Sequence, residues 1–298
     1  MKCWIWRNRQ AGAHLRIFWN ANAPISGLPV TKKPESSTPS NIKRIFTMSM
    51  LESIQSGREN KPPRIMIYGS EGVGKSTFGA SAPNAIFIQT EDGLGEINCR
   101  KFPLANSISE VIAELTALRD EPHDFQTVVI DSADWLERLI FDEVCREFGV
   151  RSIEKADGGY GKGYTHALTH WRKVINLLQE LRDKRGMMVI IVAHAKVERF
   201  EDPENAAYDR YTPRLHKHAA SLIAEWVDAV LFANKKFRVA KDGNDRAVAT
   251  PIGADGGERI IRTVGSPACI AKNRFGLPSE IPLSWAAFIT AYQKAQEA

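Results

Sequence analysis

The sequence has few cysteines and no long apolar run. Its four cysteines, Cys3, Cys99, Cys145 and Cys269, are widely scattered, and none belongs to a C-x-x-C pair. Such spacing indicates neither a zinc site nor a disulfide framework, so a reducing, cytoplasmic setting is expected. The longest uninterrupted apolar run, residues 187–193, has seven residues, far fewer than the ~20 that a membrane-spanning helix needs. We therefore expect no membrane partner.

Acidic residues are scarce in one segment only. Residues 1–47 contain eight Lys or Arg and one acid, so their net charge is +7, whereas the remaining 251 residues carry −2. The basic character of the chain thus belongs to a tail, and the domain itself has a weak overall field. We expect residues 1–47 to be a disordered extension, or translation from an over-long start assignment. The alternative is a basic arm with Trp4, Trp6 and Trp19 that contacts nucleic acid or a partner.

Short β-branched runs alternate with amphipathic segments in residues 48–298, which we expect to form a single domain. Apolar residues make up 43% of the chain and charged residues 25%, values typical of a globular protein with a real core. Buried strands are expected at 64–68, 85–89, 127–131 and 187–193; helices at 107–118, 135–149, 167–181 and 283–296; and later strands within 227–241 and 246–264, around a turn at Asp242-Gly243. This alternation predicts an α/β fold, a mostly parallel twisted sheet flanked by helices with late antiparallel strands.

A Gly-rich segment after the first expected strand carries the most specific motif. It reads Gly69-Ser70-Glu71-Gly72-Val73-Gly74-Lys75-Ser76-Thr77, which matches G-x-x-x-x-G-K-[ST] between a strand and a helix. Glycines let the backbone fold around a phosphate, so that its N–H groups face the anion. Lys75 should reach the β- and γ-phosphates, and the hydroxyl of Ser76 should bind Mg²⁺. We therefore predict that this loop binds ATP with Mg²⁺.

The strand expected at residues 127–131 ends in an acidic residue. The run Thr127-Val128-Val129-Ile130-Asp131 is typical of a buried parallel strand, and ligands bind at the carboxyl ends of such strands. We expect this strand to neighbour that of the P-loop, so that Asp131 completes the Mg²⁺ shell directly or through water. The alternative is that Asp131 caps the next helix.

The order of these motifs resembles the RecA-like P-loop ATPase core, over residues ~60–285. Within that group the chain is most similar to phage-encoded, core-only AAA-family recombination proteins related to single-strand annealing ATPases. The resemblance implies that Glu91 orients the attacking water, with Asp92 as the alternative. It also implies that His194, where the family commonly has Gln, contacts the γ-phosphate. A solvated loop acid and a satisfied loop histidine are the simpler interpretations.

The string Lys272-Asn273-Arg274-Phe275-Gly276 is similar to a motif of the RadA branch of this family. The resemblance implies that Lys272 and Arg274 act on the nucleotide of a neighbouring subunit, so the active unit would be a ring or a filament of this chain. The alternative is a surface turn closed by Gly276.

Two expected loops fall where RecA-like cores contact DNA. The first, residues 157–164, is expected to be flexible, and the second spans about 196–217. Aromatic rings interleaved with cations suit single-stranded DNA, because bases stack on the rings while cations follow the phosphates. The candidates are Tyr160, Lys162 and Tyr164 in the first loop, and Arg199, Phe200, Arg210, Tyr211 and Arg214 in the second. Acidic neighbours dilute the second loop, so a lid over the nucleotide is the alternative.

Together these features predict an ATP-hydrolysing protein that binds single-stranded DNA and assists phage or prophage recombination by annealing or strand pairing. The implied partners are single-stranded DNA, further copies of the chain and a phage single-strand DNA-binding protein, in the cytoplasm of a bacterial host. ATP would gate the affinity for DNA through His194 and the second loop. A nucleotide-gated scaffold or loader with negligible turnover and a small-molecule kinase are the rival functions.

Overall fold

The computed structural model describes residues 51, 54, 56, 57, 59, 61–204, 206–241, 247–253 and 257–297. The chain divides into two units, residues 1–57 and 58–298, and the second contains the sheet and the helices that cover it. The expectations for residues 1–47, for the boundary at residue 48 and for the turn at Asp242-Gly243 lie outside the described residues. Among the described helices, none combines the length and apolar character that crossing a bilayer requires.

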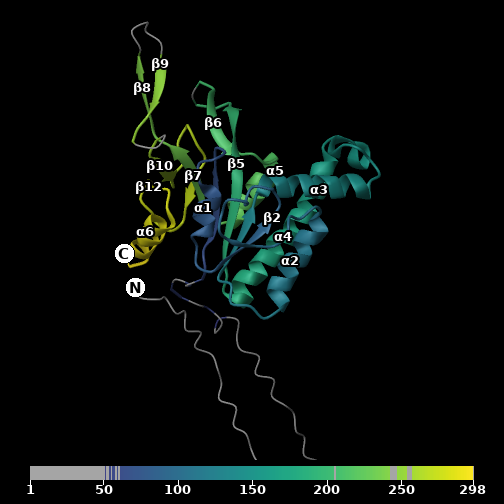
Figure 1. Ribbon diagram of the computed structural model, residues 1–298. Helices are drawn as coiled ribbons and strands as arrows, with labels where there is room; N and C mark the ends of the chain where they lie inside the picture. Colours follow the sequence, from purple (N-terminus) through teal and green to yellow (C-terminus); the bar gives the residue numbers. More distant parts are fainter. Residues whose placement is uncertain are drawn as a thin grey trace, which may run out of the picture. The chain divides into compact units, whose positions relative to one another are not determined.

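In the described residues, one mixed sheet forms the centre of the fold (Figure 1). Its main path is, in order, β12 (Glu280–Pro282), β10 (Arg259–Arg262), β7 (Ala229–Lys235), β1 (Arg64–Gly69), β5 (Met188–Phe200), β4 (Thr127–Asp131), β2 (Ala85–Gln89) and β3 (Arg100–Lys101). The path from β7 to β3 is parallel, whereas β10 and β12 pair antiparallel. In addition, β11 (Lys272–Asn273) pairs with β7, and β6 (Tyr208–Pro213) pairs with β5. A separate hairpin is formed by β8 (Phe237–Lys241) and β9 (Ala247–Pro251).

Helices cover both faces of the sheet because alternate strand residues point to opposite sides. On β1, Ile65 and Ile67 belong to the apolar cluster beneath α1 (Lys75–Ala80) and α6 (Trp285–Glu297). Met66 and Tyr68 belong to the cluster on the other face. That face is covered by α2 (Ile108–Asp120), α3 (Ala133–Glu147), α4 (Lys162–Arg185) and α5 (Lys217–Trp226). A sheet buried on both faces explains why its central strands are continuous apolar runs.

The helix ends follow local sequence signals. The hydroxyl of Ser107 accepts a hydrogen bond from the backbone N–H of Glu110 at the start of α2, as its position before the helix predicts. Helix α4 ends at Arg185 and is capped by Gly186, whose φ of 66° is the left-handed conformation that glycine adopts without a Cβ clash. The predicted α/β class, with a mostly parallel sheet, flanking helices and late antiparallel strands, is confirmed.

One expectation about the sheet is wrong. Asp131 was expected on a strand next to that of the P-loop, but β5 lies between β1 and β4 and pairs with both. Because the three strands are parallel and in register, their carboxyl ends still meet at one edge. The strand order therefore brings His194 of β5 between the P-loop and Asp131.

Both expected DNA loops also differ from the expectation. Residues 153–158 form short 3₁₀ turns, together called η2 (Ile153–Gly158), with a kink at Ala156 and Asp157. Helix α4 begins at Lys162, so Lys162 and Tyr164 are helical rather than part of a flexible loop. Strand β5 continues through His194 to Phe200 and pairs with β6, so the second loop is largely a β-hairpin, which we call the β5–β6 arm. In Figure 1 this arm and the β8–β9 hairpin project from the same end of the sheet.

Candidate functional site

A cavity of about 420 Å³ opens at the edge of the sheet where β1, β4 and β5 present their carboxyl ends. It collects most of the residues that the sequence singled out for nucleotide chemistry, from four separate segments. Its lining comprises Glu71, Gly72, Gly74, Lys75, Ser76, Thr77, Glu91, Gly93, Leu94, Ile97, Asp131, His194 and Arg259. The P-loop, Glu91 and Asp131 thus face one space, although Asp92 is not among its lining residues.

Two positions of the P-loop require glycine, each for a different steric reason. A Cβ on Gly69 would lie 2.1 Å from the carbonyl oxygen of Ala233 on β7, so the chain passes too close for any side chain. Gly74 precedes α1 with a φ of 111°, a conformation that other residues rarely adopt. Val73 between them is fully buried and anchors the loop to the apolar cluster beneath α1.

Lys75 is the buried cation of the cavity. Its side chain donates hydrogen bonds to the carbonyl oxygens of Gly69 (3.1 Å) and Ser70 (2.9 Å). Burial lowers the pKa of Lys75, and the carboxylates around it, beginning with Asp131, oppose that shift. An ammonium held in this way by neutral acceptors is available for a stronger anionic partner such as phosphate.

Asp131 and Ser76 have the chemistry of a magnesium site. Burial raises the pKa of Asp131, and a hydrogen bond from Ser76 partly offsets this. The Oδ2 atom of Asp131 is buried with no hydrogen-bond partner in the described structure. A hydroxyl and an unsatisfied carboxylate oxygen are hard donors of the kind that Mg²⁺ prefers, so the residues present fit the ion.

Glu91 lies beside β4 on the segment that follows β2. Its Oε2 accepts a hydrogen bond from the hydroxyl of Ser132 (2.9 Å), and Thr90 donates to the carbonyl oxygen of Ser132 (2.7 Å). These contacts fix the segment against the end of β4. Asp92, the alternative from the sequence, is exposed, and of these two acids only Glu91 lines the cavity.

Asp134 is the centre of an ion network that the sequence did not reveal. It accepts hydrogen bonds from the backbone N–H of His194 (3.0 Å) and from Nδ1 of the same residue (3.1 Å). Arg214 donates to it from Nη2 (2.8 Å) and to Glu71 of the P-loop from Nη1 (3.2 Å). Burial alone would raise the pKa of Asp134, but these hydrogen bonds outweigh it and hold the pKa well below its usual range.

Arg214 was predicted to contact DNA, but the structure places its guanidinium between the P-loop and α3. The residue follows β6, and its backbone N–H donates to the carbonyl oxygen of His194 (2.8 Å). It therefore joins the base of the β5–β6 arm to the nucleotide cavity. The acidic partner Asp134 stands three residues after Asp131, and only that proximity in sequence could have suggested its part in the site.

The Lys272–Gly276 string lies at the other end of the parallel strands, where they begin rather than where they finish. Lys272 and Asn273 pair with Val230 and Ala229 at the start of β7, whereas the P-loop follows the end of β1. Lys272 donates hydrogen bonds to the carbonyl oxygens of Ala224, Glu225 and Val227 (2.6, 3.1 and 2.7 Å), at the end of α5. Neither Lys272 nor Arg274 can therefore reach the P-loop of its own chain, and Lys272 has a structural use within it.

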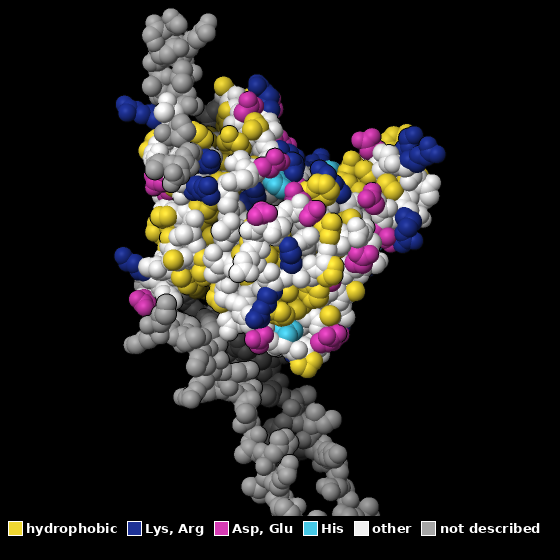
Figure 2. All heavy atoms as spheres, in the orientation of Figure 1, with side chains coloured by type: hydrophobic (Ala, Val, Ile, Leu, Met, Phe, Trp, Pro, Cys, Tyr) yellow, Lys and Arg dark blue, Asp and Glu magenta, His cyan; other side chains and the backbone are white. Residues whose placement is uncertain are grey.

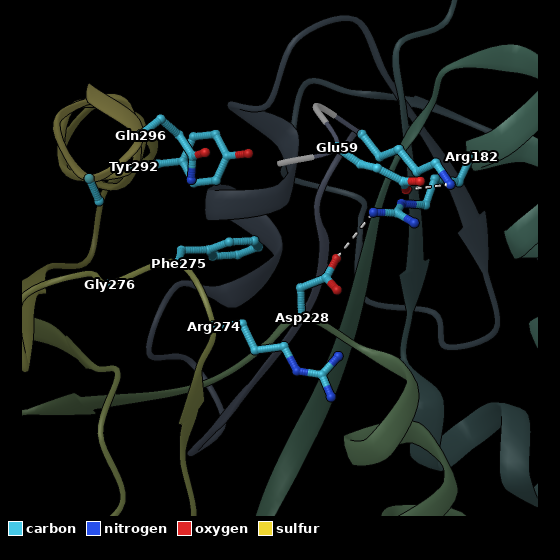
Figure 3. Close-up of a pocket in the computed structure, with 10 residues that line it drawn as sticks. Glu59, Arg182, Asp228, Arg274, Phe275, Gly276, Tyr292 and Gln296 are labelled. Carbon is cyan, nitrogen blue, oxygen red and sulfur yellow. Dashed lines mark ion pairs between the residues drawn. The ribbon is translucent and has the colours of Figure 1, made fainter. Parts of the chain in front are cut away.

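Arg274 and Phe275 line a second cavity, of about 570 Å³ (Figure 3). Phe275 packs edge-on against Tyr292 of α6, with ring centroids 4.9 Å apart. Close by, Asp228 forms ion pairs with Arg64 (2.6 Å) and Arg182 (3.6 Å). The second acid that lines this cavity, Glu59, is paired with Lys61. Within the described residues, neither Glu59 nor Asp228 pairs with Arg274.

The first group of DNA candidates flanks the start of α4. Tyr160 is fully exposed. Lys162 donates a hydrogen bond to the carbonyl oxygen of Asp157 (3.2 Å). The ring of Tyr164 stacks on that of His216, with centroids 4.0 Å apart and planes 1° from parallel. Of these three side chains, Tyr160 is the most available to a base.

The second group lies along the β5–β6 arm. Arg210 stacks over the ring of Phe200 at 3.7 Å, and Arg199 pairs with Glu201 (3.2 Å). Tyr211 stacks on Phe232 of β7 at the base of the arm. On the face drawn in Figure 2, Lys and Arg side chains are interspersed with Asp and Glu rather than gathered in a continuous patch. The arm thus offers rings with neighbouring cations, but no broad basic surface on that face.

Two comparisons relate the chain to individual proteins. The SPbeta prophage-derived uncharacterized protein YorG of Bacillus subtilis (strain 168) is 25% identical over 172 residues. The match covers 56% of this chain and 49% of YorG, so the chain spans about half the length of this curated relative. The crystal structure of the RadB recombinase aligns with a TM-score of 0.43 and 12% identity, covering 76% of this chain and 90% of RadB. These values carry no functional inference to this chain.

A family comparison covers most of the second unit. Residues 61–275 match the profile of a family described as AAA domain. The matched segment begins just before β1 and ends within the Lys272–Gly276 string, so it includes the P-loop, Glu91, Asp131 and His194. Since the match extends over more than half of the sequence, the chain belongs to this AAA domain family.

Proposed function

We propose that this AAA domain protein binds ATP with Mg²⁺ and hydrolyses the γ-phosphate. The observation that carries the proposal is the convergence of Lys75, Ser76, Glu91, Asp131 and His194 on one cavity. Each of these residues has a chemistry that phosphoryl transfer requires. Lys75 and Ser76 belong to the P-loop motif, whereas the other three come from β2, β4 and β5 or the residues just after them. A chance Gly-rich turn would not be accompanied by these groups.

The residues divide the work of hydrolysis between them. Lys75 binds the β- and γ-phosphates and stabilises the charge that develops on their oxygens. Ser76 and Asp131 would hold Mg²⁺, and the ion would supply neutralisation of the phosphate charge. Glu91 orients a water in line with the γ-phosphorus and accepts its proton, while the bond to the leaving ADP oxygen breaks. His194 is held by Asp134 through Nδ1, and in its protonated imidazolium form it would also donate a hydrogen bond from Nε2 to the γ-phosphate.

We also propose that the protein binds single-stranded DNA through the β5–β6 arm and takes part in recombination of phage or prophage DNA. Support comes from the stacked pair Arg210 and Phe200 and from Arg199 on the arm. Arg214 and His194 connect the base of the arm to the nucleotide cavity. Loss of the γ-phosphate would alter their contacts, so ATP would gate DNA affinity. Oligomerisation as a ring or filament, and a phage single-strand DNA-binding protein as partner, belong to the same proposal.

The ATPase proposal is tested with Lys75→Ala and Glu91→Gln. Both variants should lose turnover by at least about 100-fold, because each removes a group that acts on the transition state. Lys75→Ala should also lose binding of Mg²⁺-ATP in calorimetry, whereas Glu91→Gln should retain it. Wild-type protein that binds Mg²⁺-ATP without measurable turnover would contradict hydrolysis and favour the scaffold or loader function.

The DNA proposal is tested separately with an oligonucleotide of single-stranded DNA. Replacing Arg199 and Arg210 by Gln should weaken binding and reduce its salt dependence, since two cations no longer displace counterions. ATP binding by this variant should be unchanged. The exposed Arg151→Gln and Lys155→Gln changes, on the segment before α4, serve as a charge-matched control. Equal binding by the arm variant, the control and the wild type would remove the arm from the DNA site.

A further inference from the structure

Arg259 is a lining residue of the nucleotide cavity to which no motif assigns a role. It is the first residue of β10, which pairs antiparallel with β7, and its register partner is Lys235. On β7, Ala233 pairs with Gly69 of β1. Arg259 therefore stands two residues beyond the point where β1 ends, at the edge of the sheet from which the P-loop emerges.

The side chain of Arg259 points to the same face as α1. Strand residues two apart share a face, and Ile261 belongs to the apolar cluster beneath α1 together with Phe78. The Nη1 atom of Arg259 lies 3.3 Å from the position that a Cβ on Gly74 would take. The guanidinium is thus in contact with the loop where the backbone turns into α1.

No carboxylate among the described residues pairs with Arg259. The neighbouring acids are engaged by another cation, since Lys236 binds Glu258 (3.6 Å) and Glu280 (2.5 Å). Arg214 differs from Arg259 in this respect, because Asp134 and Glu71 both hold it. Arg259 therefore supplies an exposed guanidinium that no carboxylate of the described residues engages, beside a loop with the chemistry of an anion site.

We propose that Arg259 is a phosphate-binding residue of this site, which contacts the polyphosphate chain of the nucleotide from the side of β10. The inference rests on the proposed nucleotide site. The free guanidinium adds a second cation to Lys75, in a cavity whose other ionised groups are largely acidic. Because a guanidinium matches phosphate oxygens and not a particular base, its contribution is the same for ATP and GTP.

The test is calorimetric titration of the full chain with Mg²⁺-ATP, Mg²⁺-GTP and Mg²⁺-tripolyphosphate. Arg259→Gln should raise the dissociation constant about 10- to 100-fold for each ligand that the wild type binds, the range of a lost charge-assisted contact. Arg259→Lys should recover part of the loss. The matched control is Arg262→Gln on the same strand, whose side chain points to the other face and does not line the cavity; it should stay within about twofold of wild type.

The outcomes separate this inference from the proposed function. Since the side chain is exposed and pairs with no carboxylate in the part of the chain that the structure describes, Arg259→Gln should keep the melting temperature of the wild type. Wild-type binding of Mg²⁺-ATP with an unchanged constant for Arg259→Gln would overturn the role of Arg259 alone. A loss confined to one nucleotide base, or an equal loss in Arg262→Gln, would also overturn it. Absence of wild-type binding to Mg²⁺-ATP would overturn both proposals.

Discussion

At the residue scale, the same chemical type has different uses in different surroundings. Asp131 and Asp134 are three residues apart in the sequence, and both side chains are buried. Asp134 has its charge satisfied by His194 and Arg214, whereas Asp131 has an oxygen with no hydrogen-bond partner among the described residues. The partners of Asp134 stabilise its charged form, whereas that oxygen of Asp131 is available to coordinate a cation. Partners, rather than residue type, distinguish a structural acid from a candidate ligand.

Replacing Asp134 by Asn should destabilise the fold by about 3 kcal/mol at pH 7, because a buried ion pair loses one member and leaves Arg214 and His194 without it. The pKa of Asp134 is lowered on folding, so its stabilisation is full above the ordinary value of 3.8 and fades as pH falls below it. Urea unfolding at pH 7 and below pH 4 measures this. Exposed Asp142→Asn on the same helix is the control, and an equal loss there would contradict the prediction.

Glu137 should make stability depend on pH in the opposite sense. Burial raises its pKa to about 7, so the folded state binds more protons than the unfolded state between the ordinary value of 4.5 and about 7. Stability then falls as pH rises through this window. The wild type should lose about 2 kcal/mol more than Glu137→Gln between pH 5 and pH 8. Exposed Glu121→Gln should follow the wild type, and parallel profiles for all three proteins would refute the assignment.

At the element scale, the path of β1 depends on the close contact between Gly69 and Ala233. Substitution Gly69→Ala should destabilise the protein by about 3 kcal/mol, because the new Cβ would overlap a backbone oxygen that cannot move without β7. Denaturant unfolding checks this against Gly95→Ala, where no atom lies within 4 Å of the added Cβ. A Gly69→Ala protein as stable as the Gly95→Ala protein would show that β7 can shift.

The elements themselves were largely predictable, but their ends were less so. Apolar runs and helical periodicity predicted β1, β2, β4 and the buried half of β5, because burial on both faces leaves a local pattern. The extension of β5 to Phe200 was not predicted. Its outer half has no fully buried residue: residues 194–196 are half-buried, 197–199 are exposed and Phe200 is half-buried. This half is stabilised by pairing with β6, from residues 208–213. Such pairing depends on a distant segment, so propensity within the strand does not reveal it.

At the scale of the whole molecule, the positions of the P-loop and Arg274 make the assembly testable. The P-loop lies where the parallel strands end, and Arg274 lies where they begin. Arg274 can therefore reach a nucleotide only on another copy of the chain. Lys75→Ala and Arg274→Ala should each be inactive alone. Mixed in equal amounts, they should regain turnover, because some interfaces then combine an intact P-loop with an intact Arg274. Continued inactivity of a mixture that co-assembles in light scattering would argue against a role in trans.

The sequence alone determined the layered α/β class, the P-loop and its lysine, and the acids that follow two buried strands. These features depend on local spacing, which the chain carries wherever it folds. The tertiary structure alone decided that β5 separates the P-loop strand from that of Asp131 and that Arg214 pairs with Glu71, 143 residues away. It also brought Arg259 beside Gly74. The physical reason is that a charged side chain has no preferred partner until strand order and register bring one within a few ångströms.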